Sequence, residues 1–203
     1  MIPGNLFIIT AASGAGKTSL IKALLAEDAH LKLSISHTTR KPRPGEQDGV
    51  DYHFVNDAIF LKMLGEALFL ESAEVHGARY GTSQSAVDTP LQAGHDVILE
   101  IDWQGAEQVR RLYPNAVSIF VLPPSIETLE QRLNSRGQDS QETISKRVAA
   151  ARAEMRHVSE FDYVTINHYF DVALQDIRAI IRVQRLAGAA QMQRYTGLIQ
   201  TLT

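Results

Sequence analysis

The chain has 203 residues, of which 44% are hydrophobic and 21% charged, so one substantial core fits and two ordinary large domains do not. Its 20 basic and 23 acidic residues give a net charge of −3, which argues against a chain-wide basic surface for DNA or RNA. It has no cysteine, which excludes disulfides and thiolate metal sites and suits a reducing cytoplasm.

The first predicted element is a short apolar strand at residues 6–10. This run is far too short for a signal peptide or a membrane span, and no basic segment precedes it, so we expect a cytoplasmic protein that does not enter a membrane. A Gly-rich turn follows, and then a helical pattern at residues 18–27. Strand, Gly-rich turn and helix, in this order, are the setting that a phosphate-binding loop requires.

The Gly-rich turn matches the pattern G-x-x-x-x-G-K-[ST] except at its first position, which is Ala11. Gly14 and Gly16 let the backbone turn its N–H groups toward phosphate oxygens, and the N-terminus of the following helix adds to the attraction. Lys17 can bridge the β- and γ-phosphates, and Thr18 can ligate Mg²⁺ directly. The motif therefore predicts a nucleoside triphosphate site, whose residues are Ala11, Ala12, Ser13, Gly14, Ala15, Gly16, Lys17 and Thr18.

The next part of the chain predicts a small inserted β-rich subdomain. Its strand-like segments are residues 33–36, 52–55 and 69–75. A Pro-rich turn carries Arg40 and Arg43, and two guanidinium groups held close together suit an anion with several oxygens, such as a phosphate monoester. Taken alone, such a cluster is more typical of a solvated basic loop.

Strands alternate with helices in the remainder of the chain. Strand patterns lie at residues 97–102, 116–122 and 163–166, and helical patterns at residues 104–112, 126–136, 140–158 and 172–187. This alternation predicts an α/β fold of the P-loop type, a parallel sheet with helices on both faces. Residues 125–157 contain five arginines and a break at Gly137, a pattern that suggests a mobile helical lid.

Several motifs stand in a characteristic order. They are residues 13–18, 36–46, 80–82, 101–105, 123–125 and 132–137. In this order and spacing they resemble guanylate kinase, one of the P-loop nucleoside monophosphate kinases, over residues 4–185. The resemblance implies an enzyme of purine nucleotide metabolism that transfers the γ-phosphate of ATP to GMP, with Mg²⁺ as cofactor and dGMP as a second acceptor.

The resemblance also implies three parts within this guanylate kinase-like domain. They are a core of residues 4–32, 89–124 and 158–203, a GMP-binding subdomain of residues 33–88 and a lid of residues 125–157. The residues implied for GMP are Ser36, Arg40, Arg43, Tyr52, Glu71, Tyr80, Thr82 and Asp102. Guanine presents N1–H and N2–H₂ as adjacent donors, and a carboxylate at Glu71 can accept both, whereas adenine has no such pair on that edge.

The remaining implied positions concern the ATP side. Arg136 and Arg147 match lid arginines at the transferred phosphoryl group, so Lys17, Arg40, Arg43, Arg136 and Arg147 form the predicted catalytic set. Arg132, one helical turn before Arg136, and Asn167 complete the predicted ATP site, although His168 stands where the family usually has Asp. Glu100 replaces the usual Asp at its position, and a contact to Mg²⁺ through water and a structural role are equally open.

Two alternatives compete with this interpretation. A related kinase acting on a ribose bisphosphate is disfavoured by Ser36, Glu71 and Thr82, because a sugar phosphate presents no guanine edge. A non-catalytic guanylate kinase-like interaction module is disfavoured because the phosphate-loop and lid residues are all present. The expected partners are ATP and GMP, with no nucleic acid and no membrane, and formation of a homo-oligomer stays open.

Overall fold

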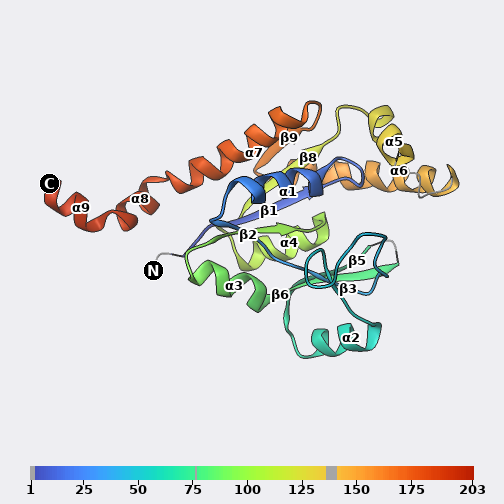
Figure 1. Ribbon diagram of the computed structural model, residues 1–203, viewed down its shortest axis with the longest axis horizontal. Helices are drawn as coiled ribbons and strands as arrows, with labels where there is room; N and C mark the ends of the chain where they lie inside the picture. Colours follow the sequence, from blue (N-terminus) through green and yellow to red (C-terminus); the bar gives the residue numbers. More distant parts are fainter. Residues whose placement is uncertain (1–2, 76, 136–140) are drawn as a thin grey trace.

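The computed structural model describes residues 3–75, 77–135 and 141–203, and two β-sheets organise them (Figure 1). The larger sheet has the strand order β2 (Leu31–Leu33), β7 (Asp96–Glu100), β1 (Leu6–Ala11), β8 (Val117–Leu122) and β9 (Tyr163–Ile166). Every neighbouring pair in it is parallel. The α/β fold with a parallel sheet is therefore confirmed.

Helices cover both faces of this sheet. Successive side chains of β1 point in opposite directions, so β1 contributes apolar residues to a cluster on each face. Phe7 and Ile9 pack toward α1 (Lys17–Glu27) and α7 (Phe170–Arg185), whereas Leu6 and Ile8 belong to a second apolar cluster. That cluster holds the buried residues of α3 (Gln84–Gln92) and α4 (Trp103–Leu112). The apolar run at residues 6–9 of β1 follows from this burial on two sides.

The smaller sheet has the order β4 (His53–Phe54), β3 (His37–Thr38), β6 (Ala78–Ser83) and β5 (Phe69–Val75), and α2 (Asp57–Gly65) packs on it. Phe60 of α2 stacks on Phe69 with ring centroids 4.5 Å apart. The predicted strand at residues 33–36 is wrong. Leu33 ends β2 in the larger sheet, and the Ser34 N–H continues that pairing with the Ile98 carbonyl before the chain crosses to the smaller sheet.

The predicted lid helices lie beside the phosphate loop at one end of the larger sheet. They are α5 (Ile126–Ser135) and α6 (Gln141–Met155), and α6 continues as a 3₁₀ turn, η1 (Arg156–Glu160), where a single helix to residue 158 was predicted. Leu133 and Ala151 form a small buried cluster with Ala12 of the phosphate loop. The lid helices therefore pack directly on the predicted nucleotide site.

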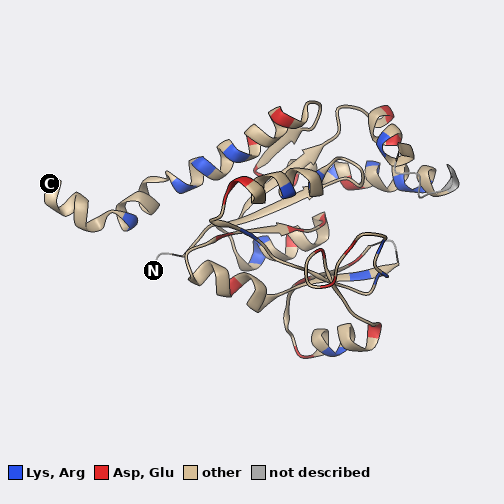
Figure 2. Cartoon of the chain, viewed as in Figure 1, with Lys and Arg blue, Asp and Glu red and all other residues tan. Residues whose placement is uncertain are grey.

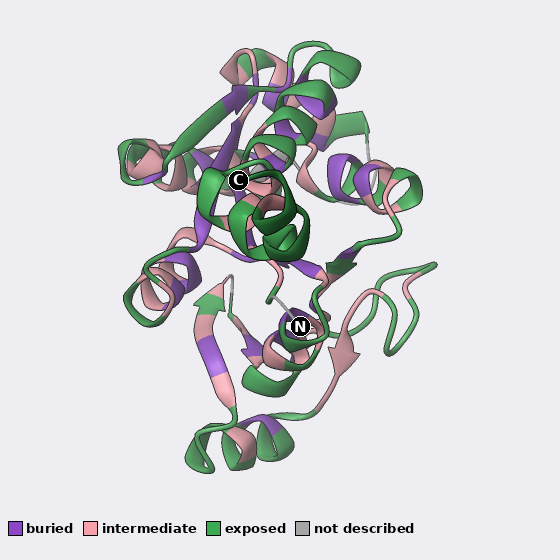
Figure 3. Ribbon diagram, turned by 90° about the vertical axis from the view of Figure 1, so that its left-hand side faces the viewer, coloured by how far each residue is buried: buried purple, intermediate pink, exposed green. Residues whose placement is uncertain are grey.

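The last two helices, α8 (Gly188–Arg194) and α9 (Thr196–Leu202), extend away from the body of the molecule (Figure 1) and contain no buried residue (Figure 3). In the described part of the chain, no helix combines the length and the apolarity needed to cross a membrane.

Candidate active site

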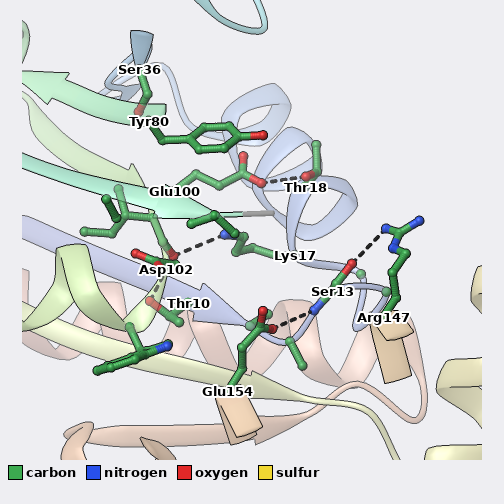
Figure 4. Close-up of a pocket in the computed structure, with 18 of the residues that line it drawn as sticks. Thr10, Ser13, Lys17, Thr18, Ser36, Tyr80, Glu100, Asp102, Arg147 and Glu154 are labelled. Carbon is green, nitrogen blue, oxygen red and sulfur yellow. Dashed lines mark hydrogen bonds between the residues drawn. The ribbon is translucent and has the colours of Figure 1, made fainter. Parts of the chain in front are cut away.

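A cleft of about 470 Å³ opens where β1 and β7 end, bounded by the smaller sheet and by α6 (Figure 4). Ligands of open parallel sheets bind at this carboxyl edge of the strands. The predicted residues that line the cleft are Ala11, Ala12, Ser13, Gly14, Gly16, Lys17, Thr18, Ser36, Arg43, Tyr52, Glu71, Tyr80, Glu100, Asp102 and Arg147. Residues from distant parts of the sequence thus meet in one space.

The phosphate loop depends on its two glycines. Gly14 and Gly16 have φ values of 93° and 97°, in the left-handed region that side chains disfavour. Gly16 caps the N-terminus of α1, and a Cβ atom there would lie 2.4 Å from Nδ2 of Asn167. The loop can therefore keep this conformation only with glycine at this position, and Gly16, Lys17 and Thr18 at the start of α1 line the cleft.

The polar ends of Lys17 and Thr18 reach the end of the neighbouring strand β7 and the residue after it. Nζ of Lys17 donates a hydrogen bond to the Ile101 carbonyl at 3.2 Å, and Oγ1 of Thr18 donates to Oε1 of Glu100 at 2.5 Å. Among the described residues, no group of three His, Asp or Glu side chains could hold a metal ion by itself. Thr18 and Glu100 could therefore supply only part of a Mg²⁺ shell, with water and phosphate oxygens as the other ligands.

A buried carboxylate lies at the other end of the cleft. Glu71 of β5 is 3% exposed, and burial raises its pKa to about 7, with hydrogen bonds from Thr82 opposing the rise and the charge of Asp102 adding to it. The hydroxyls of Ser36 and Thr82 are 2.9 Å apart beside it. A Cβ atom at Gly105 would lie 2.4 Å from Oε2 of Glu71, so glycine at the start of α4 makes room for this side chain.

Asp102 has a structural role that the sequence interpretation missed. Its Oδ1 accepts a hydrogen bond from the Gly105 N–H at 3.0 Å, which caps the N-terminus of α4, and its Oδ2 accepts from Nε2 of Gln104 at 3.0 Å. The carboxylate still lines the cleft. An Asp three residues before a helical glycine is the signal that could have indicated the cap.

The two predicted phosphate arginines differ in their surroundings. Arg43 lines the cleft, whereas Arg40 forms a bidentate pair with Glu46, with N–O distances of 2.8 and 3.0 Å. The Arg40 guanidinium lies 5.4 Å from the ring centre of Tyr52, and burial raises the pKa of Tyr52 to about 12. Glu46 thus holds Arg40 at the edge of the cleft, a role that the sequence interpretation missed although Glu46 belongs to the same motif.

The predicted residues of the lid and of the ATP site outside the loop differ in where they lie. Arg132 and Asn167 lie behind the phosphate loop, where both donate to the Ala15 carbonyl, at 3.3 and 2.7 Å. They brace the loop from outside the cleft. Arg136 lies outside the described residues, so its predicted role stays a prediction. Arg147 reaches the cleft, and its Nη2 donates to Oγ of Ser13 at 2.8 Å.

Three lid residues line the cleft without having been predicted. They are Thr143, Lys146 and Glu154, all on α6. Lysine and arginine recur along this helix (Figure 2), so the lid brings positive charge to the cleft. Their signal in the sequence is weak, because charged side chains on a helix usually face solvent.

The family model described as guanylate kinase matches residues 4–184, nearly the whole chain. The chain belongs to the guanylate kinase family. The guanylate kinase of Methylobacillus flagellatus is 67% identical over 98% of both chains, and that of Dechloromonas aromatica is 54% identical, also over 98% of both. A crystal structure of guanylate kinase from Anaplasma phagocytophilum superposes with a TM-score of 0.78 at 30% identity, covering 92% of this chain and 88% of that one.

Membership of the guanylate kinase family makes the chain an enzyme, an ATP:GMP phosphotransferase. The resemblance drawn from the sequence motifs is thereby confirmed. Neither alternative, the ribose bisphosphate kinase or the non-catalytic interaction module, is favoured by these relatives.

Proposed function

We propose that the cleft holds ATP and GMP at the same time and aligns them for transfer of the γ-phosphate to the GMP phosphate. The carrying observation is that a phosphate loop and a buried carboxylate flanked by hydroxyls open into one cleft. The loop suits a triphosphate, and Glu71 suits the adjacent donors of guanine. The reaction is the one that family membership assigns, and the residue roles below are our proposal.

At the ATP end, we assign the polyphosphate to the N–H groups of the loop and to Lys17. Lys17 would stabilise the negative charge that develops on the β–γ bridging oxygen as its bond to the γ-phosphorus breaks. Thr18 would hold Mg²⁺ directly and Glu100 through water, since both offer oxygen and their hydrogen bond places them together at the mouth of the loop. When bound there, Mg²⁺ neutralises charge on the β- and γ-phosphate oxygens.

At the GMP end, we assign the guanine edge to Glu71, Ser36 and Thr82, and the phosphate to Arg43, Arg40 and the two tyrosines. The rings of Tyr52 and Tyr80 are 5.9 Å apart in an edge-on arrangement, and both residues line the cleft. Asp102 lies next to Glu71 and adds negative charge near the guanine N2–H₂ group. dGMP is expected as a second acceptor, since none of these assigned contacts involves the ribose.

The chemistry needs no general base. The GMP phosphate is itself an anionic nucleophile near neutral pH, because its second pKa is about 6. The obstacle is the repulsion between two polyanions that must approach in line. Lys17, Arg43 and Arg147 offset this repulsion and orient the oxygens, and water is excluded when the lid closes.

We further propose that residues 33–88 act as the GMP-binding subdomain and residues 125–157 as the lid, both moving against the core. In support, the whole smaller sheet falls inside the first range, and α5 and α6 fall inside the second. A cytoplasmic location, the absence of nucleic-acid partners and the oligomeric state stay predictions.

An ADP-release assay tests this proposal. ATP is supplied with GMP, dGMP, AMP or UMP, or with no acceptor. We expect ADP release with GMP and dGMP only. Equal release with AMP would contradict the assignment of the guanine edge to Glu71, and release that does not depend on an acceptor would contradict transfer between two bound nucleotides.

A further inference from the structure

Glu154, near the C-terminal end of the lid helix α6, forms a second bond between that helix and the phosphate loop (Figure 4). We infer that Glu154 is a positioning residue, which fixes the rotation of α6 so that Arg147 points at the transferred phosphoryl group. The inference rests on the proposed function, since it takes from there the role of Arg147.

The two bonds from α6 end on the same loop residue. Oε2 of Glu154 accepts a hydrogen bond from the Ser13 N–H at 3.2 Å, and Nη2 of Arg147 donates to the Ser13 hydroxyl at 2.8 Å. Positions 147 and 154 lie two helical turns apart, on the same face of α6. One bond alone would leave the helix free to pivot about Ser13, whereas two bonds separated along the axis hold both its distance and its rotation.

Apolar packing holds α6 against the loop, and the two hydrogen bonds add direction to that contact. Between the two polar residues, α6 packs through Ala151, and further along through Ile144, on Ala12 of the loop. The same cluster includes Leu129 and Leu133 of α5, so these contacts hold α6 close to the loop, but being non-directional they do not aim a polar side chain. Hydrogen bonds weaken steeply with angle, so the bonds from Glu154 and Arg147 to Ser13 add a directional part to the lid contact.

The carboxylate does not have to compete with ATP for its donor. Ser13 is the second residue of the turn that the Ala15 N–H closes on the Ala12 carbonyl, and α1 begins only at Lys17. The N–H groups that a helix start leaves open belong to its first turn, which is where phosphate binds. The bond from the Ser13 N–H can therefore persist while the triphosphate is bound, as a positioning role requires.

The experiment is steady-state kinetics on E154A, E154Q, R147A and the double variant R147A/E154A, with R152Q as control because Arg152 is exposed on the same helix. A glutamine keeps an acceptor for the Ser13 N–H and an alanine does not. We expect E154A to lower kcat roughly tenfold or more, in line with the cost of misplacing one catalytic group, with KM for GMP unchanged. The kcat of E154Q should stay within about threefold of the wild-type value, because a neutral acceptor keeps the bond in weakened form. The kcat of R152Q should equal the wild-type value.

The double variant separates positioning through Arg147 from any other role of Glu154. If Glu154 acts by aiming Arg147, then removing Glu154 costs nothing more once Arg147 is gone. If E154A lowers kcat by the same factor in the R147A background as in the wild type, the inference is overturned and the proposed function stays intact. The same conclusion follows if E154A has wild-type kcat, or if E154A and E154Q lose kcat equally. Wild-type kcat in R147A alone would instead overturn the role that the proposed function gives to Arg147, and the inference with it.

Discussion

The two ends of the cleft are built in different ways. The ATP end is made of backbone, held in shape by Gly14 and Gly16 and braced from behind by Arg132 and Asn167. The GMP end is made of side chains from separate strands, with Glu71 buried and its pKa raised to about 7. Backbone amides recognise negative charge at any pH, whereas a buried carboxylate recognises a specific donor pattern only while it is ionised.

The largest effect is expected from a substitution at the ATP end of the cleft. K17A removes the one side-chain charge assigned to the bridging phosphates, so kcat should fall at least about 100-fold. Steady-state rates at saturating GMP measure this loss. The matched control is K22A on the same helix, since the Lys22 side chain is 67% exposed and pairs with Asp51 instead. Near-normal turnover in K17A would refute the role given to Lys17.

The next largest effect is expected from a substitution that disturbs guanine recognition and leaves ATP binding unchanged. E71Q replaces an acceptor of two hydrogen bonds by a group that can accept one and repel the other donor, so discrimination between GMP and AMP should fall by roughly 100-fold. The ratio of kcat/KM for the two acceptors measures it, and the KM for ATP should stay unchanged. Undiminished discrimination would mean that guanine is recognised elsewhere.

A smaller effect sharpens the comparison through pH. Glu71 has a raised pKa of about 7, so its accepting, ionised form is lost as the pH falls through 7. Below that point KM for GMP should rise by about tenfold per pH unit, while KM for ATP should not follow it. The GMP phosphate titrates near pH 6 as well, and E71Q, which lacks the carboxyl group, shows that contribution alone. If KM for GMP and KM for ATP changed with pH in parallel, the proposed difference between the two ends of the cleft would be contradicted.

The smallest effect concerns stability. A carboxyl group whose pKa is raised by folding stabilises the folded state while it is protonated, and this contribution disappears as the pH rises through about 7. The ligand-free enzyme should therefore be less stable at pH 8 than E71Q, by on the order of 2 kcal/mol. Urea unfolding of both proteins at pH 8 measures the difference. A less stable E71Q would show that the buried charge is fully compensated by its neighbours.

The same contrast explains what could be predicted from the sequence. The strands at residues 116–122 and 163–166 and the phosphate loop are local patterns, in which apolar runs and glycines at fixed spacing carry their own signal. β2 escaped prediction because it has only three residues with an exposed lysine between two leucines. The helix α3 was not predicted either. It contains Pro90 and buries only Val87 and Leu91, so its apolar pattern is sparse.

The side chains of the site were harder to predict where they depend on tertiary contacts. Glu71 was assigned through its place in a family motif, because a lone acid in a strand carries no sign that it will be buried. Glu46, Lys146 and Glu154 are ordinary surface-type charges in the sequence, and only the folding of the loop and the lid onto the cleft gives them partners or a place in its wall. Asn167 donates to the Ala15 carbonyl, a contact that depends on tertiary folding, and its role at the nucleotide stays a prediction.

The most direct test of the central claim is a crystal structure of the enzyme with GMP and a non-hydrolysable ATP analogue. We expect the guanine N1 and N2 atoms at about 3 Å from the Glu71 carboxylate, a usual hydrogen-bond distance. The GMP phosphate should lie at Arg43 and the triphosphate along the loop that ends at Lys17. A monophosphate bound away from Glu71 and Arg43, with full activity in solution, would contradict the account.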